Sequence, residues 1–221
     1  MKINGEHIDK EIKAIVFDCD GTIMDSELVH LQSYATIAEK YGTVYDDKLH
    51  DRFVGTSDIA VSKFLFEKVK ENFPELKWED LMHEKMELYT KSIPTLKTRE
   101  TIREFIDKVI ACGLKVCVAS STAKTELMLM LESADLAKKF PVIIGGDQVE
   151  NRKPDPSIYL KAAKEIGILP EECAALEDSP AGAESAKRAG MISIAWPHEY
   201  TKNKTFVDGV YKIESLDQIE L

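Results

Sequence analysis

The chain has 221 residues, 44% of them hydrophobic and 31% charged, and its formal net charge is −10. This composition is typical of a soluble globular protein. The acidic balance and the lack of a basic patch argue against nucleic acid as a partner.

The first predicted element is a buried strand at Ala14–Phe17, an apolar run rich in β-branched residues. The interval that follows, residues 25–91, contains helical patterns and no convincing strand. Its expected helices are Ser26–Tyr41, Asp46–Phe53, Asp58–Asn72 and Trp78–Tyr89. A helical block at this place predicts an inserted all-α cap domain.

Strands and helices alternate in the rest of the chain. The expected helices are Thr98–Cys112, Lys124–Lys138, Asp155–Ile166 and Pro180–Ala189. The expected strands are Lys115–Ser120, Val142–Gly146, Cys173–Asp178 and Ile192–Trp196, and their continuous apolar runs suit strands buried on both faces. This alternation predicts an α/β fold with a parallel sheet. We therefore expect a core domain made of residues 1–24 and 92–221, with the cap, residues 25–91, inserted between these two segments of the sequence.

Cysteine usage and the N-terminal segment indicate where such a protein works. The N-terminus carries charges where a secretory signal needs an apolar run, and no stretch is long enough to span a membrane. The four cysteines show neither a C-x-x-C pair nor a zinc spacing. We therefore expect reduced thiols, a cytoplasmic location and no membrane partner.

Chemistry-bearing residues follow the predicted strands, at the sheet edge where ligands bind. They are Asp18 and Asp20 after the first strand, Ser120 and Ser121 after the second, Lys153 beyond the third, and Glu177 and Asp178 after the fourth. Each alone has a structural explanation, such as a turn, a helix cap or a solvated lysine. Their occurrence at successive strand ends favours one shared site.

Asp18 and Asp20 raise the question of how two close carboxylates coexist, because they repel each other unless a cation or a proton offsets them. Mg²⁺ best explains the acids, since it prefers oxygen ligands and suits phosphate. Ser120, Lys153 and backbone N–H groups would then hold phosphoryl oxygens. One aspartate could serve as nucleophile and the other as acid and base.

Four segments resemble the motifs of the haloacid dehalogenase superfamily. They are DCDGT at residues 18–22, VASST around Ser120, RKPDP around Lys153 and LEDS at residues 176–179. The helical cap after the first motif is similar to that of the subgroup containing β-phosphoglucomutase and the small sugar-phosphate phosphatases. The resemblance implies a Rossmann-like catalytic core, a mobile cap and a small phosphorylated metabolite as substrate.

The same resemblance implies roles for single residues. Asp18 would be the nucleophile that forms an aspartyl-phosphate, while Asp20 protonates the leaving oxygen and then activates water. Mg²⁺ would be held by the Asp18 carboxylate, the Asp20 backbone carbonyl and Asp178, with Glu177 in support. The phosphoryl group would be held by Ser120, Ser121, Lys153 and the backbone N–H groups of Cys19 and Asp20. One departure is that Leu96-Lys97-Thr98 stands where the family commonly has Pro-Gly-Val.

The cap bears on whether the chain is a phosphatase or a mutase. His30 stands where β-phosphoglucomutase has a cap histidine, although a surface or core-edge histidine on an amphipathic helix is the explanation that we favour. A mutase also needs a cap arginine for the second phosphate of a bisphosphate, and Asp58 stands at that position. Because an acid would repel that phosphate, we predict a phosphatase, with a β-phosphoglucomutase-type phosphotransferase as the alternative.

A closing cap would select the substrate by excluding water until the right ligand fills it. The candidate selecting residues are His30, Gly55, Thr56, Ser57 and Asp58, although the last four are also an ordinary helix entry. A catalytically silent binding protein with the same fold is the alternative of another class, and the four intact motifs argue against it. We expect a monomer, and the sequence does not name the substrate.

Overall fold

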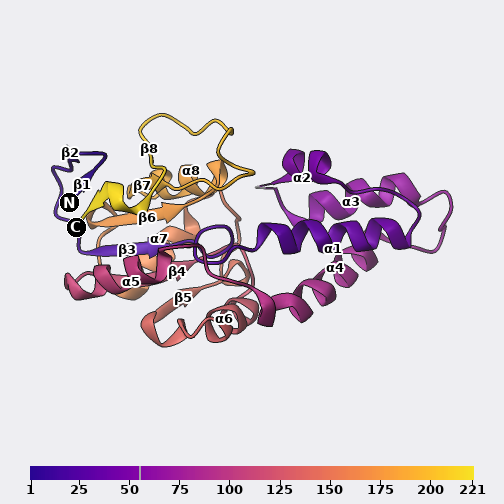
Figure 1. Ribbon diagram of the computed structural model, residues 1–221, viewed down its shortest axis with the longest axis horizontal. Helices are drawn as coiled ribbons and strands as arrows, with labels where there is room; N and C mark the ends of the chain where they lie inside the picture. Colours follow the sequence, from indigo (N-terminus) through magenta and orange to yellow (C-terminus); the bar gives the residue numbers. More distant parts are fainter. Residues whose placement is uncertain (55) are drawn as a thin grey trace. The chain divides into compact units, whose positions relative to one another are not determined.

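The computed structural model describes residues 1–54 and 56–221. The chain divides into two compact units (Figure 1). The first consists of Met1–Asp25 and Lys97–Leu221, and the second of Ser26–Leu96. Each unit has an apolar core of its own.

A six-stranded parallel sheet forms the centre of the first unit, in the order β5–β4–β3–β6–β7–β8. The strands are β3 (Ala14–Phe17), β4 (Lys115–Ala119), β5 (Val142–Ile144), β6 (Cys173–Glu177), β7 (Ile192–Ala195) and β8 (Tyr211–Lys212). The predicted α/β class with a Rossmann-like parallel sheet is confirmed. The strand order reverses beside β3, which pairs with β4 on one side and β6 on the other, and ligands of such sheets bind outside the carboxyl ends at this switch point.

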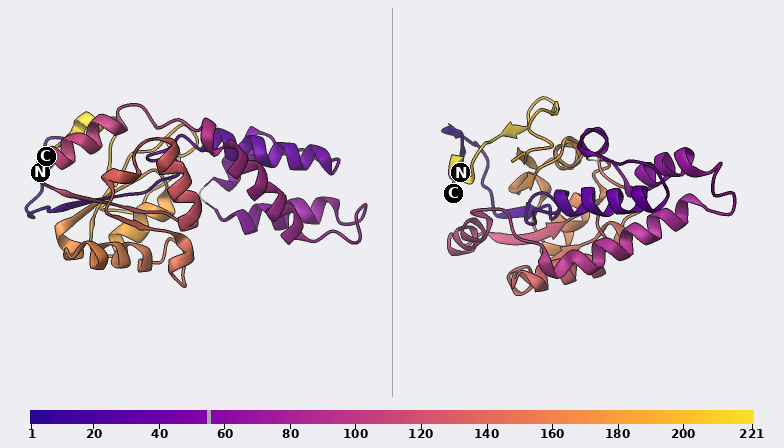
Figure 2. Two further views of the ribbon diagram at one scale, coloured as in Figure 1. Left: turned by 90° about the horizontal axis from the view of Figure 1, so that it is seen from below. Right: turned by 45° about the vertical axis from the view of Figure 1, so that its right-hand side comes forward.

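Helices cover both faces of the sheet (Figure 2). They are α5 (Ile102–Ala111), α6 (Lys124–Ser133), α7 (Ser157–Ile166) and α8 (Pro180–Arg188), with short 3₁₀ turns η2 (Ala137–Lys139), η3 (Gly146–Gln148), η4 (Pro170–Glu172) and η5 (Leu216–Gln218). Val16 of β3 packs in the apolar cluster with α7 and α8, whereas its neighbour Phe17 contacts Phe105 of α5. Burial of both faces explains why the strands read as continuous apolar runs.

Two predicted helices differ from the observed ones by four residues or more at one end. α5 begins at Ile102 rather than Thr98, because Thr98 pairs with Met24 and the Arg99 N–H donates to the Ile23 carbonyl, which keeps this segment extended. α6 ends at Ser133 rather than Lys138, and Asp135 just beyond it has a left-handed φ of 52°. A left-handed residue ends an α-helix.

The ends of the chain meet in a second, antiparallel sheet that the sequence did not predict. Its strands are β2 (Glu6–His7), β1 (Lys2–Ile3) and β9 (Ile219–Glu220). Asn4 and Gly5, at φ 53° and 78°, form the two-residue turn between β1 and β2, which is a preferred hairpin sequence. Lys2 and Glu220 add an ion pair of 2.8 Å.

The regular elements in the described residues of the second unit are all helices. It contains α1 (Glu27–Lys40), α2 (Asp47–Phe53), α3 (Asp58–Val69), α4 (Trp78–Ser92) and the 3₁₀ turn η1 (Ile93–Thr95). Side-chain caps begin two of the helices: Asp46 accepts from the Leu49 N–H, and Ser57 accepts from the Ala60 N–H. The core of this unit includes Leu31, Tyr34, Ile37 and Leu65, each buried on one side of its helix.

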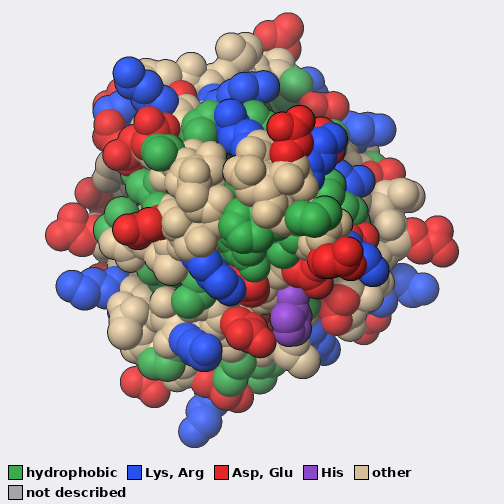
Figure 3. All heavy atoms as spheres, turned by 90° about the vertical axis from the view of Figure 1, so that its right-hand side faces the viewer, with side chains coloured by type: hydrophobic (Ala, Val, Ile, Leu, Met, Phe, Trp, Pro, Cys, Tyr) green, Lys and Arg blue, Asp and Glu red, His purple; other side chains and the backbone are tan. Residues whose placement is uncertain are grey.

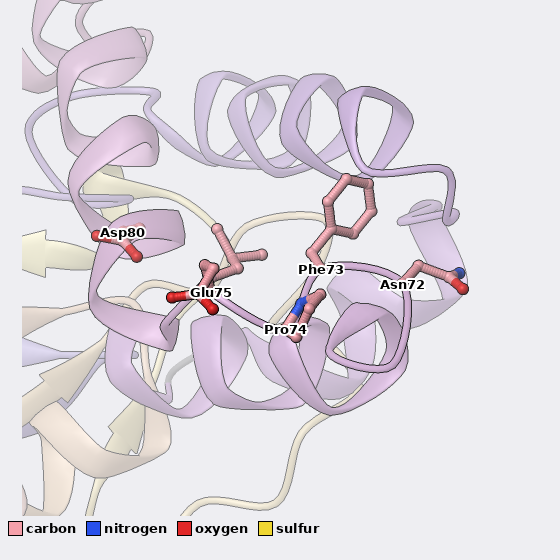
Figure 4. A pocket seen from close by; sticks show the side chains of 6 residues that line it. Asn72, Phe73, Pro74, Glu75 and Asp80 are labelled. Atoms are coloured by element: carbon pink, nitrogen blue, oxygen red, sulfur yellow. The ribbon is translucent and has the colours of Figure 1, made fainter.

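The second unit has a hollow on its surface. Acidic and basic side chains intermingle on the face in Figure 3. A hollow of about 450 Å³ lies where α3 is joined to α4 (Figure 4), and it is lined by Asn72, Phe73, Pro74, Glu75, Leu76 and Asp80. Two carboxylates and no cation line it, so it does not suit an anionic ligand. Within the described ranges, none of the helices has the length and apolar character needed to cross a membrane.

Candidate active site

The turn after β3 holds Asp18 at the edge of the sheet. The Asp18 N–H donates to the Leu176 carbonyl of β6 at 3.0 Å, and the side chain is buried. The Cys19 carbonyl then accepts from three successive N–H groups, those of residues 22–24, at 2.9–3.2 Å. Gly21 closes this turn at φ 73°, and a Cβ there would lie 2.7 Å from Asp178 Oδ2, so only glycine fits.

Lys153 lies between two buried carboxylates. Its Nζ is 2.6 Å from Asp18 Oδ1 and 2.6 Å from Glu177 Oε1, and it also donates to the Ala119 carbonyl at 3.0 Å. Burial by itself lowers the pKa of a lysine, but the charges of Asp18 and Glu177 raise the pKa of Lys153 above its ordinary value. The ammonium is therefore a fixed positive charge at the end of the strands.

Three acids gather around this lysine. Oxygen atoms of Asp18, Glu177 and Asp178 lie within 4.8 Å of one another, and all three residues are buried. Burial raises the pKa of Asp18 well above its ordinary value, Lys153 opposes this, and the other two acids add to it. One ammonium among three carboxylates leaves the cluster short of positive charge. A divalent cation that takes oxygen ligands fits this donor set, and Mg²⁺ is such a cation.

Glu177 is held by neighbours on both of its oxygens. Tyr159 of α7 donates to Oε1 at 2.5 Å, and Ser179 donates to Oε2 at 3.2 Å. Burial raises the pKa of Tyr159 well above its ordinary value, so the phenol keeps its proton and remains a donor. Gly182 of α8 packs against this carboxylate, where a Cβ would overlap it.

Asp20 has different surroundings from Asp18. Its Oδ2 accepts hydrogen bonds from Thr122 Oγ1 at 2.5 Å and from Ser120 Oγ at 3.4 Å, on the loop after β4. Asp18 instead contacts Lys153 and the acids. The two aspartates thus turn to different sides of the same strand end, which reduces their repulsion and gives them separate environments.

The remaining core residues named from the sequence also lie at this edge. Ser120 is buried, and its Oγ accepts from the Thr122 N–H at 3.2 Å. The Ser121 carbonyl packs closely on Gly146, where a Cβ would overlap it. Burial raises the pKa of the Cys19 thiol well above its ordinary value, so the thiol stays protonated and any role of Cys19 in binding falls to its backbone.

The residues named in the second unit have local partners. The His30 ring stacks on Tyr89, with centroids 4.3 Å apart. Thr56 Oγ1 donates to the Phe53 carbonyl at 2.7 Å, and Ser57 caps α3. Gly55 lies outside the described residues.

Asp58, whose side chain is partly exposed, forms an ion pair with a buried lysine that the sequence did not indicate. Its Oδ1 lies 2.8 Å from Nζ of Lys85, which is 1% exposed, and it accepts from Tyr34 Oη at 2.5 Å. Lys85 also lies over the rings of Tyr34 and Tyr89. A lysine at the apolar spacing Leu81–Lys85–Tyr89 of α4 is the signal that could have found it.

A family model described as "Haloacid dehalogenase-like hydrolase" matches residues 15–196. The chain belongs to this family. It is 35% identical over 185 residues to "Phosphorylated carbohydrates phosphatase" of Thermotoga maritima, covering 83% of this chain and 84% of that protein. It is 29% identical over 188 residues to "Beta-phosphoglucomutase" of Bacillus subtilis, covering 83% and 82%.

A solved crystal structure has the same fold. It is the crystal structure of CbbY from Rhodobacter sphaeroides in complex with phosphate, with a TM-score of 0.79, 26% identity and coverage of 95% of this chain and 100% of that one. The predicted family is confirmed, as is the enzyme class, a phosphoric monoester hydrolase. The roles predicted for single residues stay predictions.

Proposed function

We propose that the chain is a Mg²⁺-dependent phosphatase that hydrolyses a small sugar phosphate through an aspartyl-phosphate. The observation that carries the proposal is the buried cluster of Asp18, Glu177 and Asp178 around Lys153, at the switch point of the sheet. The names of the Thermotoga and Bacillus relatives support a phosphorylated sugar as the substrate class.

In the first half of the reaction, a carboxylate oxygen of Asp18 attacks phosphorus. An oxygen–phosphorus bond forms to Asp18, and the bond between phosphorus and the sugar oxygen breaks. The Asp20 carboxyl group gives its proton to that oxygen, so the sugar leaves as a neutral alcohol. Lys153 holds the phosphoryl oxygens and offsets their charge.

In the second half, water attacks the phosphorus of the aspartyl-phosphate. The Asp20 carboxylate takes a proton from this water, the bond to Asp18 breaks, and inorganic phosphate leaves. Thr122 and Ser120, which donate to Asp20 Oδ2, keep the carboxylate in place through both proton transfers. Both aspartates return to their starting states.

The metal site would use the acids already described. Asp18 and Asp178 would ligate Mg²⁺ with the Asp20 carbonyl, and Glu177 would support them. When bound, the cation supplies positive charge that offsets the phosphoryl oxygens and the acids. Ser121 and the N–H groups of Cys19 and Asp20 would add donors to the phosphoryl group.

The second unit supports a phosphatase rather than a mutase. Asp58 is an acid and neutralises the charge of buried Lys85, so this pair offers no uncompensated cation to a second phosphate. We infer that this unit is the cap, and that His30, Thr56, Ser57 and Asp58, with Gly55, select the substrate. The Bacillus relative's name keeps the β-phosphoglucomutase-type phosphotransferase as the alternative.

The experiment is hydrolysis of p-nitrophenyl phosphate and then of a panel of sugar phosphates, with Mg²⁺ or with EDTA. We expect Mg²⁺-dependent release of phosphate that falls to background in Asp18→Asn, while Asp20→Ala slows turnover or traps the phospho-enzyme. Asp9→Asn, at a fully exposed acid, is the control and should match the wild type. No Mg²⁺-dependent turnover above Asp18→Asn would sink the proposal and favour a silent binding protein.

The mutase alternative has its own test. β-Glucose 1-phosphate is incubated with the enzyme and a trace of glucose 1,6-bisphosphate, and both glucose 6-phosphate and inorganic phosphate are followed. Faster formation of glucose 6-phosphate than of phosphate would replace the phosphatase with the mutase.

A further inference from the structure

A histidine outside the four motifs contacts one of the acids of the site. His198, on the loop after β7, places its Nε2 3.0 Å from Asp178 Oδ2. The histidine side chain is 11% exposed and the carboxylate 6%, so little water competes for this contact. The contact lies in the first unit, one strand along the sheet from β6.

The ring nitrogens of His198 have distinct roles. Nδ1 accepts a hydrogen bond from the Tyr200 N–H at 3.3 Å, and a nitrogen that accepts carries no proton. Nε2 of the neutral ring therefore carries the proton and donates it to Asp178. In this arrangement Nε2 serves the Asp178 carboxylate as a hydrogen-bond donor.

The loop that carries His198 is fixed by its own hydrogen bonds. The His198 N–H donates to Thr201 Oγ1 at 3.0 Å, and its carbonyl accepts from the N–H groups of Thr201 and Lys202 at 3.0 and 2.8 Å. Thr201 is completely buried. The ring is therefore held in place before any ligand arrives.

Arg99 ties this loop to the turn after β3. Its guanidinium donates to the carbonyls of Gly21 at 2.9 Å, Trp196 at 2.7 Å and Pro197 at 3.2 Å, and it lies over the Trp196 ring. Burial lowers the pKa of Arg99 to about 10, against the charges of Asp178 and Asp25, which raise it. The guanidinium thus remains a cation that joins the two loops on either side of the β6 end.

Both oxygens of Asp178 receive a donor from these loops: His198 donates to Oδ2, and Thr22 Oγ1 donates to Oδ1 at 3.3 Å. We propose that His198 is a positioning residue, which orients the Asp178 carboxylate to receive the divalent cation. Groups that orient metal ligands in this way commonly change metal affinity when they are removed. This inference rests on the proposed function, because that function supplies the cation.

The experiment compares the wild type with His198→Ala, His198→Gln and the control Glu199→Gln, an exposed neighbour paired only with Lys202 among its described ion pairs. Mg²⁺ binding to the phosphate-free protein is measured by calorimetry, and the Mg²⁺ dependence of p-nitrophenyl phosphate hydrolysis is measured in parallel. Melting in EDTA checks that each variant folds. Gln is chosen because its amide can replace the Nε2 donor.

We expect His198→Ala to weaken Mg²⁺ binding about 10- to 100-fold, while kcat at saturating Mg²⁺ stays within a few-fold of the wild type. His198→Gln should recover most of the affinity, and Glu199→Gln should match the wild type. Wild-type affinity in a folded His198→Ala would overturn the inference and leave the proposed function intact, as would a failure of Gln to recover any affinity. Absence of Mg²⁺ binding to the wild type would overturn both the inference about His198 and the proposed Mg²⁺-dependent function.

Discussion

The Lys153 ammonium lies 2.6 Å from the Asp18 carboxylate, and both side chains are more than nine-tenths buried. Water cannot replace either partner, so the loss of one leaves the other as an unpaired buried charge. The pair therefore matters both to the chemistry proposed for Asp18 and to the stability of the first unit.

Lys153→Met should lower kcat/KM for p-nitrophenyl phosphate by about 10²–10³-fold, as expected when a fixed charge is lost from a developing anion. It should also lower the free energy of unfolding in EDTA by about 3–5 kcal/mol, because three buried acids lose their cation. Lys161→Met, on α7 beside an exposed Glu165, is the control and should change neither quantity appreciably. Near-wild-type kcat/KM in Lys153→Met would exclude its phosphoryl contact.

The ion pair between Asp58 and buried Lys85 predicts a pH effect. Burial raises the pKa of Asp58, whereas Lys85 and, after it, His30 lower it. The result is a pKa below the ordinary value of 3.8. Because the folded pKa is lowered, the stabilisation is present above the unfolded pKa, about 4, and is lost as pH falls through the folded value. The charge of Asp58 thus stabilises the second unit at neutral pH and not in acid.

Asp58→Asn should therefore destabilise the protein at pH 7, by about 2 kcal/mol, since it leaves buried Lys85 without its anion. The difference from the wild type should shrink as pH falls below about 4. Urea unfolding at a series of pH values measures this. Asp47→Asn, at the equivalent first position of α2, is the control for the loss of an acid at a helix start. A difference that is independent of pH would show that the charge of Asp58 is not what stabilises the unit.

The sequence predicted the core of the site because its residues follow strands, and parallel strands end at one edge. A correct prediction of where the strands end was enough to place Asp18, Ser120 and Glu177 together. Tyr159 and His198 could not be found in this way. In the sequence, Tyr159 resembles the other apolar residues of α7. His198 lies on a loop whose path depends on tertiary contacts.

The strands likewise divide into those that the sequence predicted and those that it did not. Continuous apolar runs predicted β3 to β7, while the two-residue strands β1, β2, β8 and β9 are too short to show any periodicity. The sequence also did not predict the partner of Asp58, because Lys85 lies 27 residues further along the chain in α4. Partners of this kind become visible only once the helices are packed.

Arg99 predicts a stability effect through its geometry rather than its charge. Arg99→Lys keeps the charge, but an ammonium cannot reach the carbonyls of Gly21, Trp196 and Pro197 in the same arrangement. We expect the free energy of unfolding to fall by about 1–3 kcal/mol, the cost of buried carbonyls losing a charged donor. Arg152→Lys, at an exposed position, is the control. Equal effects of the two changes in urea unfolding would argue against a specific role for Arg99.

Thr101 directly precedes α5 with a left-handed φ of 65°, a conformation that suits Gly or Asn and is strained for a β-branched residue. Its side chain makes no capping hydrogen bond to α5, so little is lost by replacing it. Thr101→Asn should raise the free energy of unfolding by about 1 kcal/mol, which corresponds to a melting temperature about 2–4 °C higher by calorimetry. Thr101→Gly should gain less, because glycine loses more backbone freedom on folding, and Thr101→Ala, which keeps the Cβ, serves as the control with the smallest gain. If neither Asn nor Gly melts above the wild type, the left-handed backbone at this position is not a source of strain.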